Sequence, residues 1–150
     1  MTSQRSIDAF LERSAIAVVG VSHSGRKFGN IACRELRAKG YVVYPVHPSG
    51  ATIDGVRSYP SLRALPGKVS SVLVVVPPEQ AVTVVREAAA SGIQHVWLQQ
   101  GAESPEVLDT CRELGLDVVA GECILMFAAP TGVHKLHQWV NRVTHRLPAA

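Results

Sequence analysis

The residues best placed to bind an anion follow the first apolar run of the chain. Residues 15–19 are apolar without alternation, which is typical of a strand covered on both faces, and the run ends at Gly20. Gly20, Ser22 and Gly25 have the spacing of the glycine-rich turn that binds a dinucleotide's pyrophosphate, with serine in place of the middle glycine. A helix that begins after such a turn aims unpaired N–H groups above the sheet. The segment predicts a phosphate site, although a glycine after a strand is also an ordinary turn residue.

Arg26 and Lys27 stand where this helix is expected to begin. Cations at a helix N-terminus oppose the helix dipole, so their presence favours an anion bound there. Serine at position 22 narrows the approach of a pyrophosphate to the backbone, but its hydroxyl can itself bond a phosphate. The alternative interpretation is a pair of solvated surface charges. Phe28 then opens the apolar stripe of a helix over residues 28–40.

A second polar turn follows the next apolar strand, residues 41–46. An NAD-binding unit carries an acidic residue near this point for the ribose hydroxyls, but here His47 and Pro48 follow and the next carboxylate is Asp54. This counts against NAD. His47 and Ser49 can bond a phosphate or a base edge instead, and a purely structural histidine is the alternative.

A third turn that could contact a ligand lies at the end of the strand expected at residues 71–76. That strand stops at Pro77 and Pro78, because proline cannot continue a central ladder. The pair offers carbonyl groups and flat apolar rings as a ledge for a purine. Equally, the second proline is a plain helix-initiating residue.

The elements that position these turns alternate along the chain. Strands are expected at residues 15–19, 41–46, 71–76, 94–98 and 116–120, with helices between them. This pattern predicts an α/β fold: a Rossmann-like, doubly wound, five-stranded parallel sheet in the order 3-2-1-4-5, with helices on both faces. We expect a single domain over residues 1–150. An N-terminal helix lies within residues 1–14, capped at Ser6, and a C-terminal helix over residues 133–147 packs on it and could form a homodimer seam.

Composition narrows the class of ligand. The 150 residues are 47% hydrophobic and 18% charged, with a net charge of +3. No apolar run approaches the ~20 residues that span a bilayer, so no membrane association is expected. The chain has no Lys/Arg block and few aromatic residues, which argues against nucleic acid and favours a small acidic ligand. Three widely spaced cysteines indicate free thiols, and therefore a cytoplasmic protein.

Catalytic and metal-binding patterns are weak. His134 and His137 are one helical turn apart but have no third ligand nearby in the sequence, so a packing or solvated role is favoured. Cys123 follows the last strand, where a ligand thiol could reach it; a buried inert thiol is the alternative. No Ser-His-Asp set or pair of carboxylates can be assembled. We therefore predict no catalytic residues and no metal site.

Taken together and in order, these segments resemble the small stand-alone CoA-binding protein family, relatives of the CoA-binding domain in the succinyl-CoA synthetase alpha subunit. The resemblance covers residues 15–124. Its marks are Val19-Gly20-Val21-Ser22, Gly25-Arg26-Lys27-Phe28-Gly29, Tyr44-Pro45-Val46-His47-Pro48, Ile53-Asp54-Gly55, Val75-Val76-Pro77-Pro78-Glu79, Val96-Trp97-Leu98-Gln99-Gln100-Gly101 and Glu122-Cys123-Ile124.

The resemblance implies a Rossmann-type domain that holds coenzyme A or an acyl-CoA over the strand ends. Phosphates would lie near the first turn, the adenosine end near the second, and the adenine or pantetheine path along the third. The site residues implied are Gly20, Val21, Ser22, Arg26, Lys27, Phe28, Val46, His47, Pro48, Val76 and Pro77. The family usually has Asn and often Lys where this chain has His47 and Ser49.

Three functions follow as hypotheses. The first is non-catalytic, regulatory binding of coenzyme A or an acyl-CoA as a small-molecule nucleotide ligand. The second is an NAD(P)-binding redox sensor or enzyme. The third is one subunit of a two-chain acyl-CoA ligase, because a chain of this length lacks the other modules of such ligases.

Overall fold

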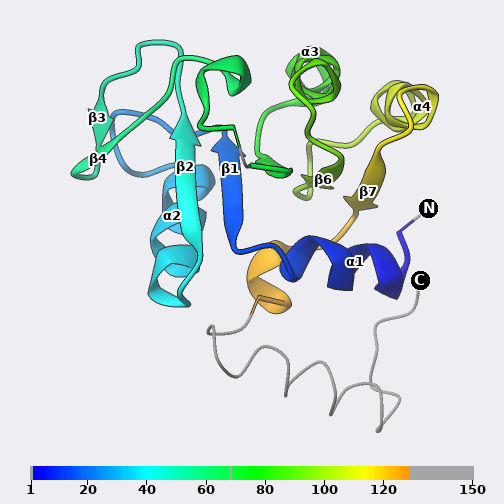
Figure 1. Cartoon of the computed structure of the whole chain (residues 1–150), viewed down its shortest axis with the longest axis horizontal. Helices are drawn as coiled ribbons and strands as arrows, with labels where there is room; N and C mark the ends of the chain where they lie inside the picture. Colours follow the sequence, from blue (N-terminus) through cyan, green and yellow to red (C-terminus); the bar gives the residue numbers. More distant parts are fainter. Residues whose placement is uncertain (1, 68, 129–150) are drawn as a thin grey trace, which may run out of the picture.

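The computed structural model describes residues 2–67 and 69–128. Its centre is a sheet of five parallel strands (Figure 1). The strands are β1 (Ala15–Val19), β2 (Val42–Val46), β5 (Ser71–Val74), β6 (His95–Leu98) and β7 (Asp117–Ala120). The expected strands are all present, and the α/β, Rossmann-like fold class is confirmed.

The order of the strands differs from the expected one. The sheet runs β2-β1-β5-β6-β7, which is 2-1-3-4-5 in the numbering of the five expected strands, so the expected order 3-2-1-4-5 is wrong. β5 pairs with β1 instead of lying outside β2, and all four of its residues are buried. β2 is one of the two edge strands: Val42 is 51% exposed, and Pro45, which has no N–H to donate, lies in it. Because proline within a sheet is confined to edge strands, Pro45 in the sequence already indicated that its strand lies at an edge.

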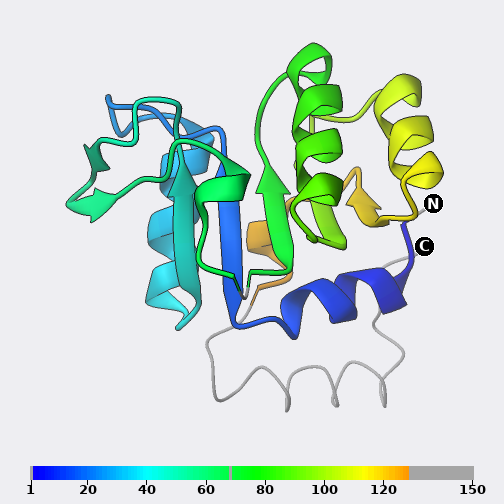
Figure 2. The same cartoon turned by 45° about the horizontal axis from the view of Figure 1, so that its top comes forward.

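Helices cover both faces of the sheet. Helices α1 (Gln4–Leu11) and α2 (Phe28–Ala38) pack on one face, and α3 (Pro78–Ala90) and α4 (Pro105–Glu113) on the other (Figure 2). The first core is built around Trp97, which is fully buried with its ring 5.4 Å from that of Phe10. The second core is aliphatic, from Val72, Val74, Ala81, Val85, Val96 and Leu98 among others.

The N-terminal helix begins earlier than expected. Its N-cap is Ser3, whose Oγ accepts the N–H of Ser6, so the expectation of a cap at Ser6 is wrong. The Ser6 hydroxyl instead donates to the Asp117 carboxylate at 2.5 Å and fastens the helix to β7. The predicted inward residues Ile7, Phe10 and Leu11 are buried. The expected helix over residues 133–147, with His134 and His137, lies outside the described residues.

The stretch between β2 and β5 has short elements of its own. β3 (Thr52–Ile53) and β4 (Val56–Arg57) form a hairpin whose turn residues, Asp54 and Gly55, both have positive φ. Asp-Gly is a preferred pair for such a turn. Two short 3₁₀ turns, η1 (Leu62–Ala64) and η2 (Ile124–Met126), complete the described chain.

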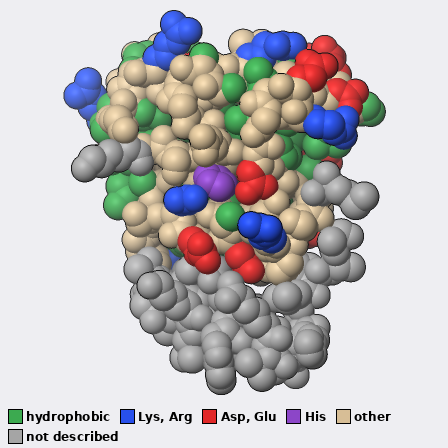
Figure 3. All heavy atoms as spheres, turned by 45° about the vertical axis from the view of Figure 1, so that its right-hand side comes forward, with side chains coloured by type: hydrophobic (Ala, Val, Ile, Leu, Met, Phe, Trp, Pro, Cys, Tyr) green, Lys and Arg blue, Asp and Glu red, His purple; other side chains and the backbone are tan. Residues whose placement is uncertain are grey.

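The charge distribution on one face and the character of the helices bear on what this protein can contact. On the face at the right-hand side of Figure 1, acidic and basic side chains are interspersed among small hydrophobic patches (Figure 3). No helix within residues 2–67 and 69–128 has the length and apolar character needed to cross a bilayer.

Candidate functional site

A cavity of about 480 Å³ lies at the carboxyl ends of β2, β1 and β5. In Figure 1 this is the edge toward which the β1 and β2 arrows point. The chain leaves β1 for α2 and β2 on one side and β5 continues the sheet on the other, so strand order reverses at β1. Open α/β sheets bind ligands at such a reversal. The cavity is lined by Val19, Gly20, Val21, Lys27, Val46, His47, Pro48, Pro60, Ser61, Leu62, Val76, Glu79, Gln80, Thr83, Val84 and Glu87.

Most of the residues singled out in the sequence come together there. Gly20, Val21, Lys27, Val46, His47, Pro48 and Val76 line the cavity, whereas Ser22, Arg26, Phe28 and Pro77 do not. Arg26 is exposed to solvent, and Phe28 packs against the core beneath α2. Pro77 lines a neighbouring cavity of about 230 Å³, together with Val76, Gln100 and Gly101. Val76 borders both cavities, which places them side by side along the strand ends.

Neighbouring backbone atoms lie very close to Gly20 and Gly29, the two glycines that flank the turn between β1 and α2. Gly20 has φ +124°, and a Cβ there would collide with the Val75 carbonyl. A Cβ on Gly29 would collide with the carbonyl of Gly20. A side chain at Gly20 would therefore push the end of β1 away from the segment after β5, and one at Gly29 would push the start of α2 away from the end of β1.

Asn30 fixes the shape of this turn, a role that sequence reasoning missed. Its side chain is 1% exposed; Oδ1 accepts the Ser22 N–H at 3.0 Å, and Nδ2 donates to the Ser22 carbonyl at 2.9 Å. Arg34 Nη1 extends the same network, donating to the Gly25 carbonyl at 3.1 Å and to Asp54 Oδ2 at 2.9 Å. The Ser22 N–H is consequently occupied. The one available signal was a polar residue in the apolar stripe of the helix.

The start of α2 supplies the positive end of the cavity. Lys27 is the N-cap and has no side-chain cap bond, while the N–H groups of Asn30 and Ile31 bond the Lys27 carbonyl. The N–H groups of Phe28 and Gly29, in the first turn, have no intrahelical acceptor. Lys27 lines the cavity and begins α2, so a cation and the positive end of a helix dipole lie at this side of the site, and both favour a bound phosphate.

A histidine cluster borders the cavity at the end of β2. His47 Nδ1 accepts the Ser49 N–H at 3.1 Å and lies 2.9 Å from Ser49 Oγ. Ser49 Oγ also lies 3.1 Å from His23 Nε2, and the two imidazole rings are 4.4 Å apart. Desolvation, reinforced by His23 and Lys27, lowers the pKa of His47 below its ordinary value. Ser49 and His23 were not expected to belong to one cluster, because residues 26 apart in the sequence meet only through the strand pairing of β1 and β2.

The opposite wall is acidic and was also missed. Glu79 and Glu87 project from α3, and Glu87 Oε1 accepts the Leu62 N–H at 2.7 Å. The Glu87 contact holds the segment Pro60–Leu62 against α3, so that segment and the helix form the cavity's far side. The site is therefore polarised, with the Lys27 cation at the glycine turn and the carboxylates of Glu79 and Glu87 on α3.

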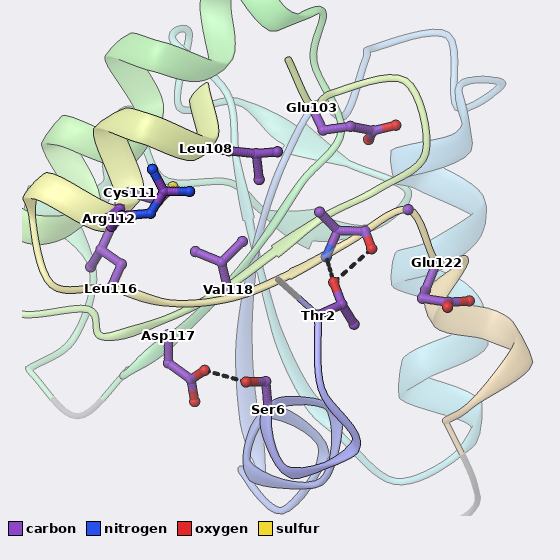
Figure 4. Close-up of a pocket in the computed structure, with 12 residues that line it drawn as sticks. Thr2, Ser6, Glu103, Leu108, Cys111, Arg112, Leu116, Asp117, Val118 and Glu122 are labelled. Carbon is purple, nitrogen blue, oxygen red and sulfur yellow. Dashed lines mark hydrogen bonds between the residues drawn. The ribbon is translucent and has the colours of Figure 1, made fainter. Parts of the chain in front are cut away.

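A larger cavity, of about 610 Å³, lies elsewhere, beside the edge strand β7 (Figure 4). The Thr2 hydroxyl lies within it and bonds both the N–H and the carbonyl of Ala120, each at 2.7 Å. Thr2 therefore covers part of an open sheet edge, a protective role. None of the residues singled out as a candidate ligand site lines this cavity.

Among known proteins, the chain is 30% identical over 130 residues to the uncharacterized protein YneT of Bacillus subtilis, with 86% of this chain and 96% of that protein covered. It is 26% identical over 129 residues to the alpha subunit of ADP-forming acetate–CoA ligase II of Pyrococcus furiosus. That match covers 79% of this chain but only 28% of the ligase subunit. A solved structure of a conserved hypothetical protein from Pyrococcus furiosus superposes with a TM-score of 0.71 and 38% identity, covering 75% of this chain and 97% of the other.

The family model described as a CoA binding domain matches residues 14–129. The match begins just before β1 and includes the glycine turn, the histidine turn and every strand of the sheet. The chain therefore belongs to the CoA-binding domain family.

Proposed function

We propose that this protein binds coenzyme A or an acyl-CoA in the cavity at the strand ends, without catalysing a reaction on it. The diphosphate lies over the N–H groups of Phe28 and Gly29 beside Lys27. The adenosine end lies over Val46, His47 and Pro48. The observation that carries the proposal is that this cavity joins a helix N-terminus and a cation to the strand-order reversal of a sheet in a CoA-binding family.

The pantetheine arm would continue past Val76 and Pro77 into the neighbouring cavity at Gln100 and Gly101. The two cavities share Val76, and the proposal has the extended ligand run past it from one to the other. Their combined lining is apolar around Val76 and Pro77, which suits the pantetheine chain. An acyl group would sit at the far end, away from Lys27.

A non-catalytic role is supported by the composition of the cavity. Within the described part of the chain, its ionisable lining residues are Lys27, His47, Glu79 and Glu87. Glu87 is engaged with the Leu62 N–H, and His47 is held by Ser49, so neither faces the path of a thioester. Among the described residues, the lining at the pantetheine end contains no cysteine, serine–histidine pair or carboxylate pair.

Calorimetric titration of the purified protein with coenzyme A, acetyl-CoA, NAD and NADPH tests this proposal. Coenzyme A or acetyl-CoA should bind and the nicotinamide nucleotides should not, because the end of β2 carries His47 where NAD sites carry a carboxylate. Preferential binding of NAD or NADPH would refute the proposal and favour a redox sensor or enzyme.

A second candidate function is supported by the likeness to the ligase alpha subunit. As one subunit of a two-chain acyl-CoA ligase, this chain would present the bound thiol to a separate nucleotide-binding partner. This chain spans about a quarter of the length of that ligase subunit, 28%. Affinity capture from its own cell extract, followed by mass spectrometry, tests this: recovery of an ATP-grasp partner supports it, and recovery of the chain alone contradicts it.

A further inference from the structure

The hairpin of β3 and β4 carries the motif Ile53-Asp54-Gly55, to which the proposed function gives no role. Asp54 has φ +51° and is, within residues 2–67 and 69–128, the only residue besides glycines with a positive φ. Its neighbour Ile53 is buried in the core on the α1 and α2 face, which anchors the hairpin to the domain. Asp54 does not line the cavity, so any effect on a ligand must pass through other residues.

The Asp54 carboxylate reaches the glycine turn, residues 20–25, through two side chains of α2. Oδ2 accepts an N–H of Arg34 Nη1 at 2.9 Å and lies 3.5 Å from Asn30 Nδ2. The same Arg34 nitrogen donates to the Gly25 carbonyl at 3.1 Å. Asn30 in turn bonds the N–H and the carbonyl of Ser22. One carboxylate thus contacts both side chains that hold the turn.

The turn also approaches Asp54 directly. A Cβ on Gly25 would lie 2.9 Å from Asp54 Oδ1, so the carboxylate would have to move to make room for it. Gly25 has φ +72°, a conformation that residues with a side chain rarely adopt. The hairpin and the turn are therefore in close contact at Gly25.

This link contributes little to folding. The Arg34 side chain is 48% exposed and that of Asp54 31%. An ion pair this exposed contributes about 0.2–1 kcal/mol, too little to decide whether the domain folds. The same energy changes an affinity by up to about fivefold. A contribution of Asp54 to binding can therefore be measured without loss of the fold.

The segment that carries Asp54 borders the cavity on its other side as well. Beyond β4, the Tyr59 N–H donates to the Pro45 carbonyl and the His47 N–H to the Tyr59 carbonyl, each at 2.9 Å. Residues 60–62 then line the cavity. The excursion between β2 and β5 thus contacts the glycine turn at its tip and forms a cavity wall at its end.

We propose that Asp54 is a positioning residue for the ligand site and acts through Arg34 and Asn30 on the turn at residues 22–25. This inference rests on the proposed function. The turn leads directly into Lys27 and the start of α2, so its shape sets where that cation and the helix N-terminus lie. By charge alone, a carboxylate near an anion site would weaken binding. The bonds of Asp54 are expected to have the opposite effect, which separates positioning from charge.

The test is calorimetric titration with coenzyme A of the wild type, Asp54→Gly and Asp54→Asn. Glycine removes the carboxylate and keeps the positive φ, whereas asparagine tolerates that φ and its amide oxygen still accepts the Arg34 N–H. Asp54→Gly should weaken binding about two- to fivefold, the range of an exposed ion pair. Asp54→Asn should retain most of the affinity.

Asp109→Ala is the matched control. It removes another exposed ion pair, with Arg112 at 2.8 Å on α4, and Asp109 does not line the cavity. This variant should bind coenzyme A as the wild type does. Arg34→Ala should lose at least as much affinity as Asp54→Gly, and the double variant should bind no more weakly than Arg34→Ala, because both changes break one link. Unchanged or tighter binding in Asp54→Gly, or losses that add in the double variant, would overturn the proposal.

Amide hydrogen exchange in the free protein provides a readout that needs no ligand. The Ser22 N–H should exchange about two- to fivefold faster in Asp54→Gly, while the Val18 N–H in β1 keeps its rate, since the fold is not destabilised. Equal acceleration at both amides would show a merely structural role and overturn the proposal. A wild type that does not bind coenzyme A would refute the proposed function, whereas unaltered Ser22 exchange would refute the positioning role, so the two failures are distinguishable.

Discussion

The Asn30 side chain hydrogen-bonds both backbone groups of Ser22, its N–H and its carbonyl. Its Oδ1 accepts the Ser22 N–H at 3.0 Å, and its Nδ2 donates to the Ser22 carbonyl at 2.9 Å. Because the Asn30 side chain is 1% exposed, water cannot replace these bonds without local opening. The turn at the proposed ligand site therefore owes its shape to a residue that does not line the cavity.

Replacing Asn30 by alanine should destabilise the protein by about 1–3 kcal/mol, because a buried donor and acceptor lose their partners. Urea unfolding measures the change. Coenzyme A should also bind more weakly, since the turn is released. Arg34→Ala, whose bonds to Gly25 and Asp54 are exposed, is the matched control and should cost less than 1 kcal/mol or so. Equal losses in the two variants would show that Asn30 has no special role.

Gly29→Ala should also destabilise the fold. A methyl group there would collide with the Gly20 carbonyl, and relieving such overpacking costs about 1–3 kcal/mol, more than alanine's helix propensity returns. Gly67→Ala is the control, because nothing lies within 4 Å of a Cβ at that position. Thermal unfolding of the two variants compares them, and a Gly29→Ala protein as stable as the Gly67→Ala protein would be the contrary outcome.

The sequence predicted the elements better than their arrangement. Strand and helix positions follow from apolar runs and glycine or proline stops, which are local signals. The order 3-2-1-4-5 was wrong because it rested on the commonest arrangement for such folds, whereas Pro45 marked its own strand as an edge. That proline is the kind of local clue that can decide topology.

Site residues that stand at the ends of strands or helices were predicted from the sequence. Residues that act through contacts between distant segments were missed. Lys27 and His47 stand at strand or helix ends, so the topology alone brings them to the cavity. Asn30, Asp54 and Glu87 act through partners 8, 20 or 25 residues away, which no local pattern reveals. Ser22 was expected near the phosphates through its hydroxyl, and its N–H is bonded to Asn30 by such a contact.

Alkaline pH should destabilise the protein through three buried acids. Burial raises the pKa of Cys33 and Cys111 from 9.0 to about 11, and that of Tyr41 from 10.0 to about 12. The folded state then holds these protons more tightly than the unfolded state does. The unfolding free energy is therefore unaffected well below the ordinary thiol pKa and falls as the pH rises through it toward the raised values of the folded state.

Unfolding in urea between about pH 8 and about pH 10.5 checks this, a window that spans the ordinary thiol pKa of about 8.5. Cys33→Ala removes one of the acids and should make the decline shallower, whatever it does to stability at neutral pH. A stability that stays constant to the upper end of this range would contradict the raised pKa values.

Alkylation at neutral pH offers a second readout: the partly exposed Cys123 should react well before Cys33 and Cys111.

The most direct test concerns the two adjacent cations of the glycine turn. Lys27 lines the cavity, whereas Arg26 is exposed and does not, so the pair separates a ligand contact from general charge. Coenzyme A affinity should be measured by calorimetry at low and at moderate salt for the wild type, Lys27→Ala and Arg26→Ala. Lys27→Ala should weaken binding roughly three- to tenfold, up to ~1.4 kcal/mol, and flatten its salt dependence, while Arg26→Ala should change it by less than about twofold. Unchanged binding in Lys27→Ala at low salt would contradict the placement of the phosphates at the start of α2.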